Sequence, residues 1–242
     1  MYNLYMYIPF DLQTTLQGLY SPKKPLNILD AGAYDGDTAN LFFSIFPNAT
    51  IYAFEPHEDT FQKLSLFRDS HPLKDNLFIY NLGLSSCEGS SDLNSFSANG
   101  YRSSSLKNIN SDSFSILNKF HPKEDFLNST ILPVTLTTLD KFFEEHNLAI
   151  DVLKIDCQGS ELDILLGGRN ALAQSLIDVI VIEIIFDDVY QLPPQYFSRI
   201  LAELESNDFY LYDISHIYKQ FKLGRTLWAE FVFCRRARFG GF

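Results

Sequence analysis

The chain has few of the residues that mark several common classes of protein. It contains three cysteines among 242 residues and no C-x-x-C pair, which excludes a zinc knuckle and a disulfide framework. A reducing cytoplasm is therefore the expected location. No run of Lys or Arg is longer than two residues and the net charge is -11, so neither DNA nor RNA is an expected partner.

Long hydrophobic runs are also missing. The most apolar stretch, 177–186, contains Asp178 and Glu183 and is too short to span a bilayer. Residues 1–10 have neither a positive segment nor a long apolar one, so a signal peptide is not expected. The remaining composition is that of a globular protein, with 46% hydrophobic and 20% charged residues. The length suits a single α/β domain over residues 1–242.

A glycine-rich loop near the N-terminus lacks the third glycine of the dinucleotide-binding pattern G-x-G-x-x-G. Residues 27–38, Asn-Ile-Leu-Asp-Ala-Gly-Ala-Tyr-Asp-Gly-Asp-Thr, run from an apolar strand through a turn into a helical pattern. This order makes a nucleotide site in α/β proteins. A second apolar run, 50–54, leads to Glu55, about 25 residues after Asp30, where an acid binds a ribose diol. The two stretches predict a bound adenosine cofactor.

The charges of the loop indicate which cofactor binds there. A dinucleotide pyrophosphate needs G-x-G-x-x-G, whereas this loop is G-x-x-x-G, with Asp35 between the glycines and Asp37 after them. Carboxylates at the helix N-terminus would repel a pyrophosphate. A cofactor with a positive centre and no phosphate fits better, and S-adenosylmethionine is the common one. The alternatives are an acid-capped strand, turn and helix without a ligand, and an NAD-dependent oxidoreductase.

Predicted strands and helices alternate along the rest of the chain. Strands are expected at 77–82, 151–156, 177–185, 208–214 and 228–234, and helices at 57–69, from 138, after Gly159 and from Pro193-Pro194. The last two strands are expected to form an antiparallel hairpin. The predicted fold class is α/β: a Rossmann-like, doubly wound, mostly parallel seven-stranded sheet with an antiparallel C-terminal edge strand.

Two segments are expected to lie outside this alternation. Residues 1–25 are predicted as an N-terminal lead-in with a helix at 11–19. Residues 85–133 are predicted as a Ser-rich insertion on the substrate side, because a compact fold rarely carries so long an irregular segment without a use for it. The alternative is a mobile segment without a role at the site. Within the insertion, 91–97 and 131–136 are expected to pair as strands, and 101–105 to line an acceptor pocket.

Four segments resemble the FkbM-like methyltransferase family. They are LDAGAYDGDT (29–38), YAFEP (52–56), VTLTTLD (134–140) and LKIDCQGSE (153–161). The last is the most specific, because Lys-Ile-Asp-x-x-Gly-x-Glu follows a Thr-Leu-Asp segment at the family's usual interval. The resemblance implies a Rossmann-like methyltransferase that uses S-adenosylmethionine to O-methylate a sugar, glycolipid or polyketide-like molecule. Gln158 is a departure, since many members have Glu there.

The first two motifs supply most of the expected cofactor ligands. Glu55 is expected to accept hydrogen bonds from both ribose hydroxyls, because a carboxylate has two acceptor oxygens. Asp30 and Asp37 are placed either to bind the cofactor amine or to staple the loop itself. Leu82 is expected to lie against the adenine. The complete predicted set is Asp30, Gly32, Ala33, Tyr34, Gly36, Asp37, Thr38, Glu55, Pro56, Asn81 and Leu82.

Asp156 and Glu183 are the predicted catalytic residues. Asp156 ends a strand at the edge of the sheet where ligands bind, so it is expected to be a general base or a substrate anchor. The alternative is a carboxylate that bonds the Gly159 turn. Glu183 lies inside an apolar strand, where a charge must find a partner or raise its pKa. Asp187 would complete a hard-cation site, but no His or ligand spacing supports one, so no metal is predicted.

The expected function is therefore that of an S-adenosylmethionine-dependent O-methyltransferase. Its acceptor is expected to be a hydroxyl of a saccharide, glycolipid or other small molecule. A non-catalytic S-adenosylmethionine-binding module is the alternative that Gln158 leaves open. The sequence gives no indication of the oligomeric state.

Overall fold

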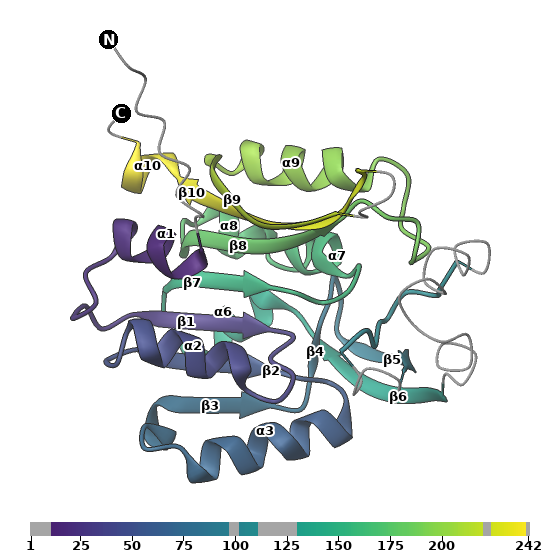
Figure 1. Ribbon diagram of the computed structural model, residues 1–242, viewed down its shortest axis with the longest axis horizontal. Helices are drawn as coiled ribbons and strands as arrows, with labels where there is room; N and C mark the ends of the chain where they lie inside the picture. The colour runs from purple at the N-terminus through teal and green to yellow at the C-terminus, as the bar shows by residue number, and fades with distance from the viewer. Residues whose placement is uncertain (1–10, 97–101, 111–129, 220–223, 241–242) are drawn as a thin grey trace.

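The computed structural model describes residues 11–96, 102–110, 130–219 and 224–240 (Figure 1). Seven strands form its main sheet in the order β3-β2-β1-β7-β8-β10-β9. The strands are β1 (Asn27–Ala31), β2 (Thr50–Phe54), β3 (Leu77–Tyr80), β7 (Ile150–Ile155), β8 (Ile177–Ile185), β9 (Phe209–Lys219) and β10 (Thr226–Arg235). The pairs among β3, β2, β1, β7 and β8 are parallel, while β10 is antiparallel to both β8 and β9. The predicted fold class is confirmed, with β10 one position inside the edge that β9 forms.

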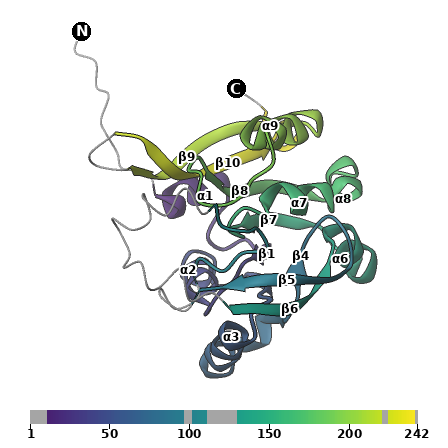
Figure 2. The ribbon, with the colours of Figure 1, turned by 90° about the vertical axis from the view of Figure 1, so that its right-hand side faces the viewer.

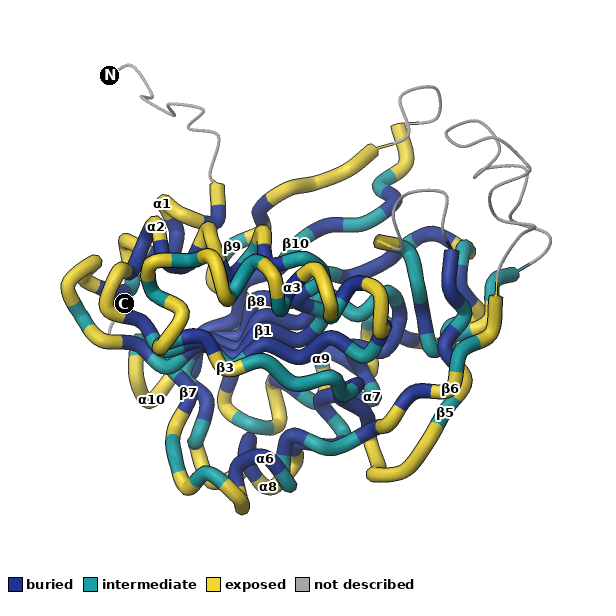
Figure 3. Tube along the Cα trace, turned by 90° about the horizontal axis from the view of Figure 1, so that it is seen from below, coloured by how far each residue is buried: buried dark blue, intermediate teal, exposed yellow. Residues whose placement is uncertain are grey.

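Helices cover both faces of the main sheet (Figure 1 and Figure 3). Apolar side chains of α1 (Leu12–Leu19), α2 (Asp37–Ile45) and α3 (Glu58–Ser70) pack on one face. Those of α6 (Leu139–His146), α7 (Glu161–Leu166), α8 (Arg169–Ala173) and α9 (Tyr196–Ser206) pack on the other. Because both faces are covered, β7 and β8 are buried almost throughout, as their mostly apolar sequences require. The short helices η1 (Lys74–Asn76) and α10 (Arg236–Phe239) complete the described helices.

A second, three-stranded sheet lies beyond the carboxyl ends of the main strands (Figure 2). It consists of β4 (Gly83–Leu84), β5 (Gly89–Ser95) and β6 (Thr130–Thr137), in the order β4-β6-β5. β5 and β6 pair antiparallel, with Ser91 opposite Val134, so the predicted pairing within the insertion is confirmed for the described residues. Backbone bridges join Asn94 to Ser105 and Ile109 to Tyr190. The insertion is thereby fixed against the loop that follows β8.

Several predicted boundaries were wrong. The third strand ends at Tyr80, and Gly83 begins the separate strand β4 instead of a turn. Pro193-Pro194 does not start a helix, because Gln195 adopts a left-handed conformation (φ +59°) and α9 begins only at Tyr196. Residues 1–10, 97–101 and 111–129, which include parts of the predicted lead-in and insertion, lie outside the described residues. Within the described ranges, no helix has both the length and the apolar character needed to cross a bilayer.

Candidate functional site

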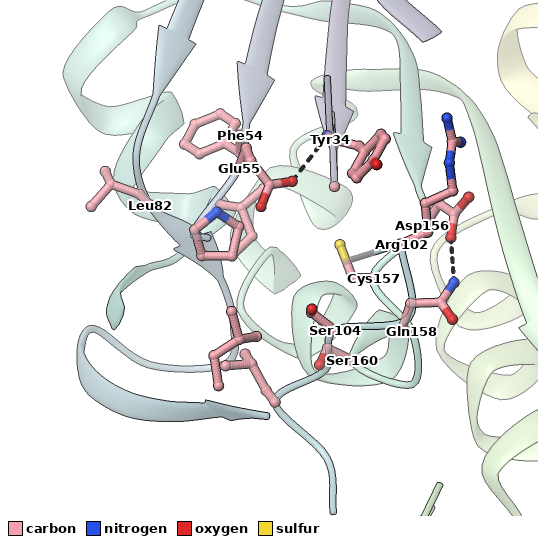
Figure 4. A pocket seen from close by; sticks show the side chains of 16 residues that line it. Tyr34, Phe54, Glu55, Leu82, Arg102, Ser104, Asp156, Cys157, Gln158 and Ser160 are labelled. Atoms are coloured by element: carbon pink, nitrogen blue, oxygen red, sulfur yellow. Dashed lines mark hydrogen bonds between the residues drawn. The ribbon is translucent and has the colours of Figure 1, made fainter. Parts of the chain in front are cut away.

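Two neighbouring cavities open at the carboxyl ends of the main strands. The first, a space of about 600 Å³ that is partly open to solvent, lies among β2, the β3–β4 turn and the insertion (Figure 4). The second, a space of about 1320 Å³ that is also partly open to solvent, reaches the ends of β8, β9 and β10. The residues that line both cavities are Gly32, Tyr34, Arg102, Asp156 and Gln158. These residues form a shared wall between the two cavities.

The glycine loop passes directly against the end of β7. Gly32 has φ +85°, and a Cβ there would lie 2.1 Å from the carbonyl oxygen of Asp156, so only glycine fits. The amides of Gly32 and Ala33 both donate to the carbonyl of Phe54 at 3.0 Å. The loop is thus fixed between β2 and β7, with bare backbone facing both cavities.

Glu55 anchors the same loop from β2. One of its carboxylate oxygens accepts from the amide of Tyr34 at 2.9 Å (Figure 4). The other accepts from the amide of His57 at 2.9 Å and from the hydroxyl of Thr60 at 2.8 Å. Burial raises the pKa of this carboxyl, although the three donors act against the rise. A carboxylate has about four acceptor positions, so capacity remains for a hydroxyl in the first cavity.

Asp30 is buried without a hydrogen-bond partner. Its side chain is 1% exposed, and neither carboxylate oxygen has a donor within the described part of the chain. Burial raises its pKa to about 7, although the positive charge of Lys154 lowers it. Asp30 therefore does not staple the loop, which was one of the two roles predicted for it. An unsatisfied buried carboxylate is costly, so a ligand donor is the expected partner.

A buried lysine compensates the acids around the shared wall. Lys154 is 5% exposed, and its Nζ lies 3.4 Å from Asp156 Oδ2 and 3.5 Å from Glu230 Oε2. Burial lowers the pKa of Lys154, but the surrounding carboxylates, Asp156 foremost, outweigh burial and raise it above its ordinary value. A permanent positive charge therefore lies beneath the ends of β7, β8 and β10.

Gln158 connects the two predicted catalytic acids. Its Nε2 donates to Asp156 Oδ1 at 2.9 Å and to Glu183 Oε2 at 3.0 Å. Burial raises the pKa of Asp156, but Lys154 and the Gln158 hydrogen bond reverse this and lower it. Burial and the nearby charge of Asp156 raise the pKa of Glu183 to about 9. At neutral pH Asp156 is therefore ionised and Glu183 protonated, a separation typical of acid–base sites.

The turn after Asp156 is held by a different acid. Glu161 accepts from the amide of Cys157 at 2.9 Å and from the amide of Gly159 at 3.0 Å. Gln158 and Gly159 both have positive φ, which makes this a tight turn that aims the Gln158 side chain back at the sheet. The alternative role for Asp156, bonding the Gly159 turn, is thereby taken by Glu161.

The insertion closes over the shared wall from the other side. The hydroxyl of Tyr190 lies 3.0 Å from Gln158 Oε1 and 2.9 Å from the carbonyl oxygen of Ser103, and its single proton is shared between these two acceptors. The guanidinium of Arg102 lies 4.3 Å from the ring centre of Tyr34 and 3.0 Å from Asp37. Arg102, Ser103 and Ser104 line the cavities, while Tyr101 lies outside the described residues.

Most of the predicted cofactor residues line one of the two cavities. Pro56 and Leu82 line the first, together with Glu55, and Ala33, Asp37 and Thr38 line the second. Asp30, Asn81 and Gly36 are not among the lining residues. Asn81 donates instead to Glu58, and a Cβ at Gly36 would meet the ring of Phe67 at 2.4 Å. Gly36 therefore permits the close packing of α2 against α3.

Sequence reasoning missed several residues of the site. Lys154 was part of a quoted motif, and a lysine within an apolar strand is itself a signal of a buried ion pair. Tyr190, Trp228 and Glu230 carried no comparable signal, because each is an ordinary residue of its segment until the sheet brings it to the cavity. Among the described residues, no group of three or more His, Cys, Asp or Glu side chains is arranged to hold a metal ion.

Comparison with known families identifies this arrangement. Residues 30–211 match the model of the Methyltransferase FkbM domain, which covers all four segments of the resemblance except residue 29. The chain belongs to the FkbM methyltransferase family. It is thus a methyltransferase domain, and the predicted family, enzyme class and cofactor, S-adenosylmethionine, are confirmed. No curated protein matches the chain by sequence.

Solved structures agree with the FkbM fold. The methyltransferase FkbM from Methylobacillus flagellatus KT superposes with a TM-score of 0.53 and 14% identity, covering 88% of this chain and 45% of that one. This chain thus spans less than half the length of that protein. TrmK from M. capricolum, in complex with S-adenosyl-homocysteine, gives a TM-score of 0.50 and 11% identity over 94% of this chain and 70% of that one. At these identities the likeness concerns the fold.

The residues of this FkbM domain fit its cofactor. S-adenosylmethionine carries an ammonium and a sulfonium. The carboxylates of Asp37 and Asp156 line the cavities, and the buried Asp30 carboxylate, behind their lining, has no partner among the described residues. Its ribose needs hydrogen-bond acceptors, which Glu55 retains. Its adenine needs an apolar slot, which Phe54, Pro56 and Leu82 line.

Proposed function

We propose that this FkbM methyltransferase methylates a hydroxyl of a saccharide, glycolipid or other small molecule, with Asp156 as the general base. One observation carries the proposal: Asp156 lines both cavities and is kept ionised by Lys154. A base at the boundary between donor and acceptor is what methylation of an alcohol needs, because the hydroxyl loses its proton as the new C–O bond forms.

The first cavity and the shared wall are the proposed cofactor site. S-adenosylmethionine supplies a methyl group already activated by a sulfonium. Glu55 would accept from the ribose, and Pro56 and Leu82 would flank the adenine. Asp30 would accept from the ammonium, which would satisfy its buried oxygens. Asp37 and Thr38, from the start of α2, would lie toward the methionine end.

Asp156 and Glu183 have different proposed roles. Asp156, ionised and oriented by Gln158, would take the acceptor proton. Glu183, protonated at neutral pH, lines the acceptor cavity as a neutral group that both donates and accepts hydrogen bonds. The pair would thus bind a hydroxyl-bearing acceptor without placing two negative charges beside each other. No step of this proposal needs a metal ion.

The acidity of the second cavity supports an acceptor other than nucleic acid. Asp37, Asp156 and Asp187 line it beside the neutral Glu183, and these three carboxylates would repel a phosphate backbone. The cytoplasm is the proposed location, because all three cysteines are free.

The test combines binding with transfer. Calorimetric titration with S-adenosyl-homocysteine, with NAD as a parallel control, should give saturable binding of the first alone. Labelled methyl groups should then appear on hydroxyl-bearing saccharides but not on the matched amino compounds that lack a free hydroxyl. Transfer only to amines would replace oxygen by nitrogen as the nucleophile. Cofactor binding with no transfer to any acceptor would favour the non-catalytic binding module.

A further inference from the structure

Two stacked aromatic rings form the far wall of the acceptor cavity. Trp228 of β10 and Tyr218 of β9 are cross-strand partners, with ring centres 4.8 Å apart and planes 21° apart. Both line the second cavity, whereas neither lines the first. Tyr218 is 53% exposed and Trp228 is half-buried. The pair therefore presents apolar ring surface to the cavity that Asp156 also faces.

The aromatic wall continues directly into the acid–base cluster. Trp228 and Glu230 are two residues apart in β10 and therefore lie on the same face of the strand. Glu230 contacts the ammonium of Lys154. On the neighbouring strand, Trp228 is opposite Ile185, and Glu183 is opposite Glu230. Because the two rings stack on each other, a ligand can stack only on an outer face of the pair, and there it would lie beside the groups that hold Asp156. A flat apolar surface next to hydrogen-bonding groups suits a ring with one apolar face and hydroxyls at its edge.

The charges of this cavity restrict the acceptor further. Among the described residues that line it, Arg102 is the one cation, and it is already engaged by Asp37 and by the ring of Tyr34. The other charged lining groups are carboxyls. Asp187 accepts from the amide of Asp188 at 2.8 Å, and its nearest cation is Arg225, 4.0 Å away. A negatively charged acceptor would therefore find no unpaired cation among these lining residues, and the cavity's carboxylates would repel it.

We propose that Trp228 and Tyr218 are the specificity-determining platform of the acceptor site, and that they bind the apolar face of an uncharged saccharide ring. The proposal rests on the proposed function, because it assigns the acceptor of that reaction. It adds two claims: the residues that hold the ring, and the exclusion of anionic sugars.

The chain offers a direct probe, because Trp228 is its single tryptophan. In the presence of saturating S-adenosyl-homocysteine, neutral methyl hexosides should change the tryptophan emission in a saturable way. The matched methyl hexuronosides differ by one carboxylate. Their affinity should be lower by a factor of at least roughly ten, which corresponds to about 1.4 kcal/mol.

Two tyrosines of β9 provide a matched pair of variants. Tyr218→Ala removes half of the platform, and Tyr212→Ala removes a ring of the same strand that is 37% exposed and lines neither cavity. Tyr218→Ala should weaken hexoside binding and raise KM by roughly three- to tenfold, the size of one aromatic contact, with kcat little changed. Tyr212→Ala should leave both constants unchanged. Trp228→Ala should lose transfer activity because its KM rises. Trp228→Phe keeps an aromatic ring and should retain most of that activity.

The outcomes separate this proposal from the function on which it rests. Equal losses in Tyr218→Ala and Tyr212→Ala, or a lower melting temperature with no change in KM, would mean that the stack only stabilises the hairpin, and would overturn the proposal. Hexuronosides that bind as tightly as hexosides would also overturn it. Methyl transfer to acyclic alcohols without any saturable response to hexosides would overturn the platform while leaving the O-methyltransferase intact. Absence of S-adenosyl-homocysteine binding would instead contradict the proposed function itself.

Discussion

The ammonium group of Lys154 lies 3.4 Å from Oδ2 of Asp156, two residues further along the chain. Lys154 belongs to β7 and is buried, while Asp156 follows the strand and faces both cavities. The interior of the sheet thus supplies a counter-charge to a carboxylate at the cavity surface. A carboxylate supported in this way stays ionised at neutral pH without a solvent-exposed partner.

Gln158→Glu should destabilise the protein strongly at neutral pH. The substitution removes the two hydrogen bonds that Nε2 donates and places a third carboxyl beside Asp156 and Glu183. The expected loss is roughly 2–5 kcal/mol of unfolding free energy at pH 7. The loss should shrink below about pH 5, as the carboxyls protonate.

Thermal unfolding of Gln158→Glu between pH 4.5 and 8 measures this effect. Gln62→Glu is the control, because Gln62 donates to a single glutamate on an exposed helix surface. An equal and pH-independent loss in the two variants would show that Gln158 does not separate the two acids. Adding a divalent cation should restabilise Gln158→Glu but not the wild type, since three converging carboxyls are ligands for a hard cation.

Glu183→Gln should become more stable than the wild type as the pH rises. The folded-state pKa of Glu183 is about 9, raised from an ordinary value of 4.5, so the folded protein retains a proton that the unfolded chain releases. Stability of the wild type therefore falls between these two pH values, and glutamine removes that fall. The difference should reach the order of 1 kcal/mol, after allowance for partial exposure of the side chain.

Melting temperatures from pH 5 to 9 test this prediction. Glu88→Gln, at an exposed position, is the control and should show no such trend. A difference that stays constant across the range, or that decreases with pH, would mean that Glu183 is ionised in the folded protein.

Gly32→Ala should abolish cofactor binding and destabilise the fold. The added methyl group would lie 2.1 Å from the carbonyl oxygen of Asp156, at a residue with φ +85°. The backbone of β1 or β7 must then move, at a cost of roughly 3 kcal/mol or more.

Gly89→Ala is the control that distinguishes the steric contact from the cost of positive φ. Gly89 also has positive φ (+141°), but nothing lies within 4 Å of its added Cβ. Its cost should stay near 1 kcal/mol. Similar losses of unfolding free energy in the two variants would show that the contact with the carbonyl oxygen of Asp156 is not the cause.

The sheet and the cofactor side were predictable because their signals are local. Strands such as β7 and β8 are short, mostly apolar runs. The acid-rich glycine loop is also a local signal, because twelve consecutive residues are enough to predict its strand, turn and helix. The mostly parallel sheet with its antiparallel edge follows from the alternation of strands and helices along the chain. Boundaries failed where one residue's conformation decides them, as at Gln195, whose positive φ delays α9 past the two prolines.

The acceptor side was less predictable because it is assembled from distant segments. Tyr190 reaches Gln158 across 32 positions of the chain, and Trp228 reaches the cavity only because β10 inserts between β8 and β9. The protonation states of Asp156 and Glu183 depend on Lys154, whose partners include Glu230 from a third strand. Periodicity and motif spacing carry no information about such contacts.

Asp156→Asn tests the central claim most directly. The measurement is the single-turnover rate of methyl transfer to the hydroxyl acceptor, with donor and acceptor saturating, alongside the Kd for S-adenosyl-homocysteine. If Asp156 takes the acceptor proton, the rate should fall by roughly 10²- to 10⁴-fold, the usual contribution of a general base, while Kd stays within about threefold of wild type. An unchanged rate at unchanged Kd would contradict the account and remove Asp156 as the base.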